Sequence, residues 1–110
     1  MTDEDKKLIW EWCGVSVSYL SDMGIWVFSG VYQREARLDL NNLFKYAVPE
    51  LYKRGYYYTI LQWNEGQHKA IIDKKTVEWA VTASDAIDKD PAEAFGKALL
   101  QLIKENDNDR

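Results

Sequence analysis

Few residues in this chain could carry acid–base or nucleophilic chemistry. There is one histidine, His68, and one cysteine, Cys13. A general base needs a positioned partner and a pocket. No serine or cysteine nucleophile motif accompanies His68, so we interpret it as a strand residue near a turn. Cys13 follows an apolar helix face, where cysteine is more often a small buried side chain than a reactive thiol. The sequence therefore predicts no catalytic residue, and we expect the chain not to be an enzyme.

The acidic residues Asp85, Asp88, Asp90 and Glu93 form a group that could suggest calcium. A calcium loop of the EF-hand type needs ligands at alternating positions, a central glycine and a terminal glutamate. The glycine is missing and Pro91 intervenes, so helix capping explains the group better. One cysteine and one histidine cannot supply the roughly four ligands of a zinc site. The six glycines are scattered and form no phosphate-binding loop. We expect no metal and no cofactor.

Basic residues occur as two adjacent pairs, Lys53/Arg54 and Lys74/Lys75, with Lys69 near the second. Together they could line one edge of a sheet, so a nucleic-acid-binding module is one hypothesis. The chain has 14 Lys and Arg against 18 Asp and Glu, a net charge of −4. This balance disfavours nonspecific nucleic-acid binding, which needs clustered cations to neutralise phosphates.

Aromatic residues are in excess of what a core this small can hold. The 110 residues include five Trp, seven Tyr and three Phe. Tyrosine and tryptophan are enriched at binding hot spots because they bury a large area at low entropic cost. The alternative is that they cover the second face of a sheet. The residues that we select as partner contacts are Trp26, Tyr32, Tyr56 and Tyr58.

The central element that positions these residues is a helix from Asp39 to Gly55. Asp39 can cap its first turn, and Gly55 can adopt the left-handed conformation that ends it. An apolar stripe at three- and four-residue spacing comprises Leu40, Leu43, Phe44, Ala47 and Leu51. Pro49 removes a hydrogen bond inside the helix, so we expect a kink near Val48.

Three strands follow the central helix, over residues 56–63, 68–73 and 77–83, with turns between them. We expect an antiparallel meander, with Val77, Trp79, Val81 and Ala83 on one face of its last strand. Residues 84–89 read as a polar connection. Asp90 as cap and Pro91 at the first position then open a last helix. Its stripe comprises Ala94, Phe95, Ala98, Leu99, Leu102 and Ile103, with Gly96 off the stripe.

Ahead of this core the sequence predicts a short helix and a hairpin. Thr2 or Asp3 can cap the helix, Gly14 ends it, and Trp12, ahead of Trp10, is the expected anchor against the rest of the chain. Residues 15–19 and 25–28 alternate as strands around turn residues 21–24. Residues 29–37 read as a loop.

These elements predict an α+β fold in one domain of residues 1–110. An antiparallel three-stranded meander packs with two or three helices in an α-β-β-β-α core, residues 38–105. Within this core the first helix starts at residue 39, and the apolar stripe of the last helix reaches residue 104. Residues 1–37 add the helix and hairpin, and residues 106–110 form a frayed tail. The first strand carries large side chains on both faces, which suggests that both faces of the sheet are covered. Tyr56, Tyr58 and Ile60 lie on one face, and Thr59, Leu61 and Trp63 lie on the other.

The stretch LDLNNLFKYAVPEL, the strands after it and the DPAEAFGKALLQLI helix resemble the phage ABA sandwich domain family over residues 38–104. The resemblance implies a phage or prophage origin and helices about an antiparallel sheet, and it implies no chemistry. The element order is also similar to double-stranded RNA-binding domains, but acidic residues stand where those domains carry lysines. A meander followed by PAEA also looks like HicB-type antitoxins, which bind a toxin.

We therefore expect a small non-enzymatic phage-type accessory protein that acts by binding another protein or its own copy. An inhibitor of a bacterial defence system, such as an anti-CRISPR, belongs to this class. The acidic start, Met1 to Asp5, predicts no signal peptide, and the single cysteine fits a reduced bacterial cytoplasm. No apolar run is long enough to span a bilayer, so we expect no membrane partner.

Overall fold

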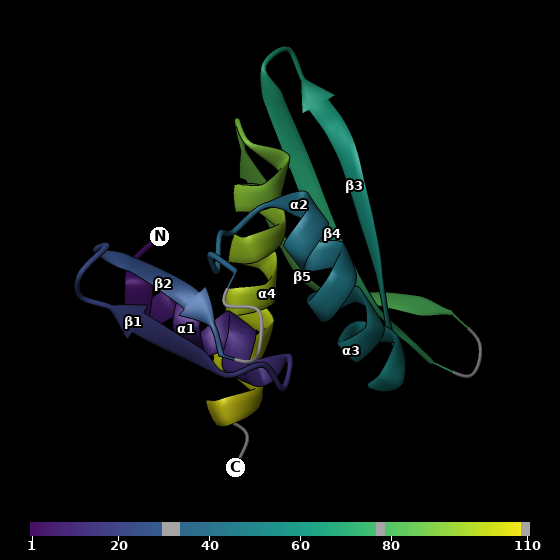
Figure 1. The fold of residues 1–110 in the computed structure, drawn as a ribbon. Coiled ribbons are helices and arrows are strands. Elements are labelled where there is room, and N and C mark those ends of the chain that lie inside the picture. Colours follow the sequence, from purple (N-terminus) through teal and green to yellow (C-terminus); the bar gives the residue numbers. More distant parts are fainter. Residues whose placement is uncertain (30–33, 77–78, 109–110) are drawn as a thin grey trace.

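A computed structural model describes residues 1–29, 34–76 and 79–108 of the chain. Tyr32 and Val77 lie outside the described residues. The elements are α1 (Asp3–Trp12), β1 (Val17–Leu20), β2 (Ile25–Phe28), α2 (Leu40–Asn42), η1 (Leu43–Ala47), α3 (Val48–Lys53), β3 (Tyr56–Asn64), β4 (Gln67–Lys75), β5 (Ala80–Asp88) and α4 (Pro91–Asn108). All of them except η1, which lies between α2 and α3, are labelled in Figure 1.

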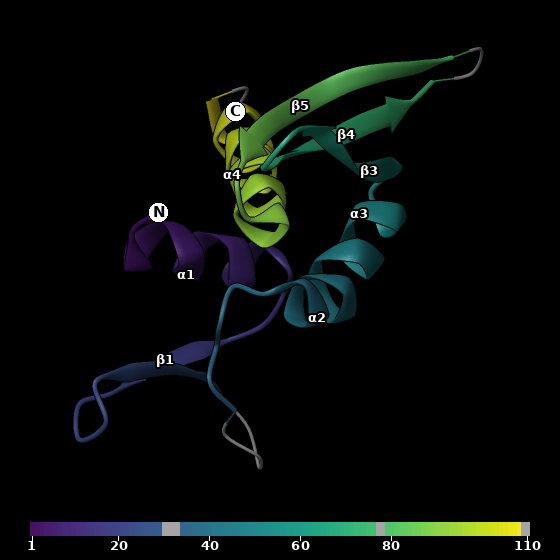
Figure 2. The ribbon, with the colours of Figure 1, turned by 90° about the horizontal axis from the view of Figure 1, so that it is seen from above.

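The predicted α+β fold and the antiparallel meander are confirmed. Strands β3, β4 and β5 form a three-stranded sheet in chain order, and β1 and β2 form a separate hairpin. Helix α4 and the α2–η1–α3 segment lie on the same side of the three-stranded sheet, and α1 and the hairpin lie beyond them (Figure 2). The expectation of covering on both sides is therefore wrong, because the described helices pack against one face only.

The central helix starts and ends where the sequence predicts. Asp39 Oδ1 accepts a 2.8 Å hydrogen bond from the backbone N–H of Asn42, and Gly55 has φ +84°. The expected break before Pro49 takes the form of one wide π-helical segment, η1. Such a turn adds a residue to the helix and gives room for the proline ring, which would otherwise clash with a carbonyl four residues earlier. Phe44 lies in η1 and is 42% exposed, so this member of the predicted stripe is not buried.

Strand β5 lies later in the chain than predicted, at residues 80–88 instead of 77–83, so the expected polar connection at 84–89 is mostly strand. A register shift between the pairs Ile72–Ser84 and Asp73–Thr82 leaves Ala83 as an extra residue. Ser84 consequently faces the helices and is buried. Its hydroxyl donates a 2.8 Å hydrogen bond to the carbonyl of Ala98, which removes the cost of burying it. Trp79 and Val81, which were predicted to share one face with Ala83, are exposed.

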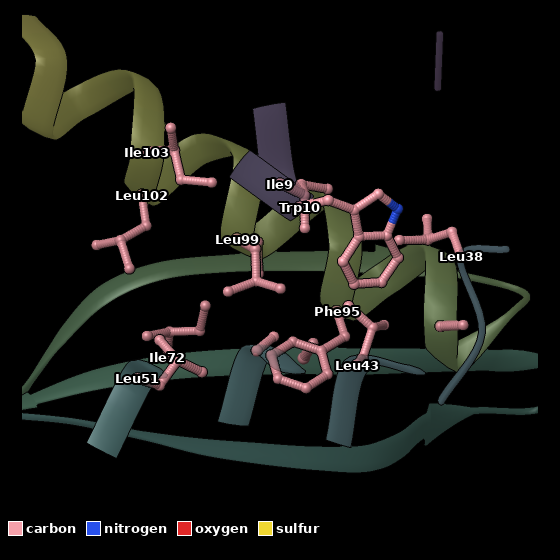
Figure 3. Close-up of a cluster of buried hydrophobic side chains, with 14 of the residues drawn as sticks. Ile9, Trp10, Leu38, Leu43, Leu51, Ile72, Phe95, Leu99, Leu102 and Ile103 are labelled. Carbon is pink, nitrogen blue, oxygen red and sulfur yellow. The ribbon is translucent and has the colours of Figure 1, made fainter. Parts of the chain in front are cut away.

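Helix α4 supplies most of the core. Its predicted stripe is buried in full, and Phe95 and Leu99 meet Leu43, Leu51 and Ile72 between the helices and the sheet (Figure 3). Asp90 Oδ1 caps the helix by accepting from the N–H of Ala92. Two details differ from prediction. The helix continues to Asn108, past the expected end at 105, and Gly96 is a packing residue, since a Cβ there would lie 2.9 Å from Cδ2 of Leu38.

The N-terminal helix and hairpin share this core. Thr2 and Asp5 form the predicted kind of cap on α1. Trp10, at 1% exposure, is the anchor, and its ring packs edge-on against Phe28 and Tyr46. The expectation that Trp12 anchors the helix is wrong, because the helical pitch turns Ile9 and Trp10 together toward α4. Trp12 lies at the margin, with the Arg54 guanidinium 4.5 Å from its ring centroid.

Candidate functional site: two exposed surfaces of the sheet

The residues that could do chemistry are dispersed. His68 pairs in the ladder with Gln62 and Asp88, and among the described residues its side chain makes no hydrogen bond or ion pair. Cys13 is half-buried at the end of α1. Burial, with a smaller contribution from the Glu50 carboxylate, raises the pKa of its thiol to about 12, so the thiol stays protonated at neutral pH.

The acidic group holds helix and sheet together. Asp85 lies on β5, with Oδ2 3.7 Å from Nζ of Lys69. Asp88 accepts hydrogen bonds from the backbone N–H of Asp90 at 3.0 Å and from Nζ of Lys97 at 2.5 Å. The first of these contacts, and then the second, lower the pKa of Asp88. In the part of the chain that the structure describes, no set of three or more His, Cys, Asp or Glu residues could hold a metal ion.

The uncovered face of the three-stranded sheet is the first candidate surface, here called the outer face. Alternation along the strands places ten side chains on it: Tyr57, Thr59, Leu61 and Trp63 of β3, Lys69, Ile71 and Asp73 of β4, and Thr82, Asp85 and Ile87 of β5. Apolar side chains recur in every strand. Tyr57 is 45% exposed, Trp63 50% and Ile87 41%, values that are high for large apolar groups.

Lys69 organises the centre of the outer face. In the ladder it lies between Leu61 of β3 and Ile87 of β5. Its Nζ is 4.1 Å from the ring centroid of Trp63 and 3.7 Å from the Asp85 carboxylate. The long methylene stem therefore joins the two apolar neighbours while the charge is balanced at the surface. The centre of the outer face is therefore a row of apolar side chains, and the one charge at its centre, that of Lys69, is already paired.

The second candidate surface is the end of the sheet where α3 leads into β3, here called the basic end. The ladder pairs Lys74 with Tyr56, and the N–H of Lys75 donates a 3.2 Å hydrogen bond to the carbonyl of Gly55. These contacts place the end of α3, which carries Lys53 and Arg54, next to the end of β4, where Lys74 lies on the helix side and Lys75 on the outer side. Lys69 is not part of this end, because it lies at the centre of the outer face.

Two exposed tyrosines accompany the lysines of the basic end. The ring centroids of Tyr52 and Tyr57 are 6.0 Å apart, and Nζ of Lys75 lies 5.9 Å from the Tyr57 centroid. Tyr52 is 53% exposed. Arg54 is engaged elsewhere, with Nε 2.8 Å from Glu50 and its guanidinium over Trp12. Among the described residues, no ion pair forms at Lys53, Lys74 or Lys75.

The residues selected as partner contacts are distributed differently. Tyr56 is 8% exposed and Tyr58 stacks on Phe95 at 5.3 Å, so both rings belong to the helix-covered face. Trp26 lies on the hairpin beside a cavity of about 170 Å³ that Trp10 also lines. Tyr32 lies outside the described residues. Reasoning from the sequence missed Tyr57 and Trp63 as exposed rings, although the two-residue alternation from a buried Tyr56 to an exposed Tyr57 was the available signal.

Comparisons with known proteins show no similarity: no protein-family model, curated protein or solved structure matches the chain. The resemblance to the phage ABA sandwich domain family has no support from them. No helix of the described residues is long and apolar enough to cross a membrane.

Proposed function

We propose that this chain is a non-enzymatic protein-binding module whose binding surface is the outer face. The observation that carries the proposal is an apolar row on a sheet face that the chain's described helices leave open. Antiparallel sheets often have one solvated face, but that face normally alternates to polar residues. Here half of the ten side chains are apolar or aromatic, among them Tyr57, Leu61 and Ile87.

The size of the outer face suits a partner that covers it fully and also contacts its rim. Three nine-residue strands at ordinary spacing present roughly 400 Å². A standard interface buries about 800 Å² on each partner. Large apolar and aromatic side chains near the centre of such a patch supply most of the binding energy, while the surrounding polar groups exclude water. We assign this central role to Leu61, Trp63 and Ile87.

A phage-type accessory role, including inhibition of a bacterial defence system such as CRISPR, stays a proposal that rests on the sequence resemblance. It is compatible with a protein-binding surface and names no partner.

The test compares three tagged baits in a bacterial lysate: wild type, Leu61→Asp and Leu8→Asp. Leu8 is 38% exposed on α1 and gives the same chemical change away from the outer face. A protein retained by wild type is purified and its affinity measured by calorimetry. We expect Leu61→Asp to weaken binding at least tenfold, because a carboxylate is placed at the centre of the contact. Equal affinity of Leu61→Asp and wild type would refute the proposal.

A further inference from the structure

The basic end combines exposed rings with cations that form no ion pair within residues 1–29, 34–76 and 79–108. Lys53 ends α3, and Lys74 and Lys75 end β4, so three ammonium groups come from two elements that meet at Gly55. Tyr52 and Tyr57 present their rings beside them. Two carboxylates on the same elements have other contacts: Glu50 of α3 pairs with Arg54, and Asp73 Oδ1 of β4 accepts from the Thr82 hydroxyl at 3.2 Å.

This end is electrostatically separate from the acidic part of the protein. Asp88 lies level with His68 in the ladder, seven residues of β4 away from Lys75. At about 3.4 Å per residue this is roughly 24 Å. The Debye length at physiological salt is about 8 Å, so the acidic end is screened from a ligand at the basic end. A net charge of −4 therefore does not prevent local binding of an anion.

We propose that the basic end is a binding site for single-stranded nucleic acid. Cations along a groove or edge neutralise phosphates, and exposed aromatic rings stack on unpaired bases, whatever their sequence. Tyr52 and Tyr57 supply the rings, and Lys53, Lys74 and Lys75 supply the charge. An acidic peptide would pair with the lysines but would leave the exposed tyrosine rings without a stacking partner. The rings therefore favour single-stranded nucleic acid over an acidic peptide as the ligand. The proposal does not rest on the proposed function, since the basic end shares only Tyr57 with the outer face and its other residues lie off the apolar row.

The binding assay is fluorescence anisotropy with a fluorescein-labelled 12-mer of oligothymidylate, from 20 to 200 mM KCl. With three phosphate contacts, the logarithm of the affinity should fall against the logarithm of salt with a slope of about −2. Affinity should then drop roughly 20-fold between 50 and 200 mM. The double variant Lys74→Glu/Lys75→Glu should reduce the slope to about −0.7 and abolish measurable binding at 200 mM.

Matched controls separate this site from general charge effects. Lys89→Glu/Lys104→Glu makes the same charge change beside and along α4 and, at about 150 mM KCl, should leave binding within about twofold of wild type. Tyr52→Ala should weaken binding about fivefold or more through lost stacking. Tyr19→Ala is its counterpart, because both tyrosines are 53% exposed and Tyr19 lies on the hairpin.

The proposal would be overturned by no binding at 20 mM KCl, by an equal loss in the two lysine double variants, or by an equal effect of Tyr52→Ala and Tyr19→Ala. Displacement of the oligonucleotide by polyglutamate at equal charge concentration would also overturn it, since the end would then be a general polyanion surface without base stacking. Leu61→Asp tests the outer face and should leave oligonucleotide binding unchanged, so the two proposals can fail separately.

Discussion

Adjacent isoleucines on β4 test whether the sheet has one buried face. Ile72 faces the helices at 0% exposure, whereas Ile71 faces outward and is only partly buried. Truncating a fully buried isoleucine to alanine costs 2–5 kcal/mol, through lost transfer energy and the cavity left behind. We take about 3 kcal/mol for Ile72→Ala. Ile71→Ala should cost under about 1 kcal/mol, most of it from lower strand propensity.

The two variants are matched because they make the same chemical change in the same central strand. Loss of strand propensity is therefore common to both, and the difference between them reports burial. For a 110-residue domain the entropy of unfolding makes 3 kcal/mol equivalent to roughly 13 °C in Tm, and 1 kcal/mol to about 4 °C. Urea titration followed by circular dichroism gives the free energy of unfolding directly, provided that the m-value stays constant. Equal destabilisation by the two variants would refute the one-sided sheet.

Three further predictions concern single residues. Ser84→Ala should destabilise the fold by about 1 kcal/mol in urea titration, because the Ala98 carbonyl loses its buried donor, while the exposed Thr82→Ala should cost less. Cys13 should react with a disulfide reagent at pH 8 far more slowly than free cysteine and speed up only on unfolding, because the pKa of its thiol is about 12. Because the folded-state pKa of Asp88 lies below the ordinary value of 3.8, its stabilisation is complete above 3.8 and is lost as the pH falls from there through the lower folded-state pKa. Asp88→Asn should therefore reduce the fall in Tm between about pH 5 and pH 3, measured by thermal scans across that range.

Local signals in the sequence predicted where most elements begin and end. Asp39, Gly55 and Asp90 act at helix termini through their own side chains or backbone, and the structure confirms each. Their effect depends on neighbours in the chain and not on the fold, which is why single-sequence reasoning identified them. The meander was predictable for the same reason, because its turns and alternation are local patterns.

The differences arise where tertiary packing decides. The register shift at Ala83 reverses which residues of β5 face inward, and no local residue signals it. Burial of Ser84 depends on a carbonyl 14 residues away in α4. Alternation showed that Tyr56 and Tyr57 face opposite ways, but which of them is exposed depends on the side that the helices occupy. Because the helices cover the face that carries Tyr56 and Tyr58, the exposed candidate contact residues are instead Tyr57 and Trp63.

The most direct test of the open outer face is methyl NMR of isoleucine-labelled protein with a soluble paramagnetic probe. The δ1 methyls of Ile71 and Ile87 should relax strongly as the probe is added, while those of Ile9, Ile72 and Ile103 should be protected, in keeping with exposures of 0%, 0% and 4%. A bound partner should then protect Ile71 and Ile87 as well. If these two methyls are as protected as Ile72 in the protein alone, the outer face is already covered and the central claim is wrong.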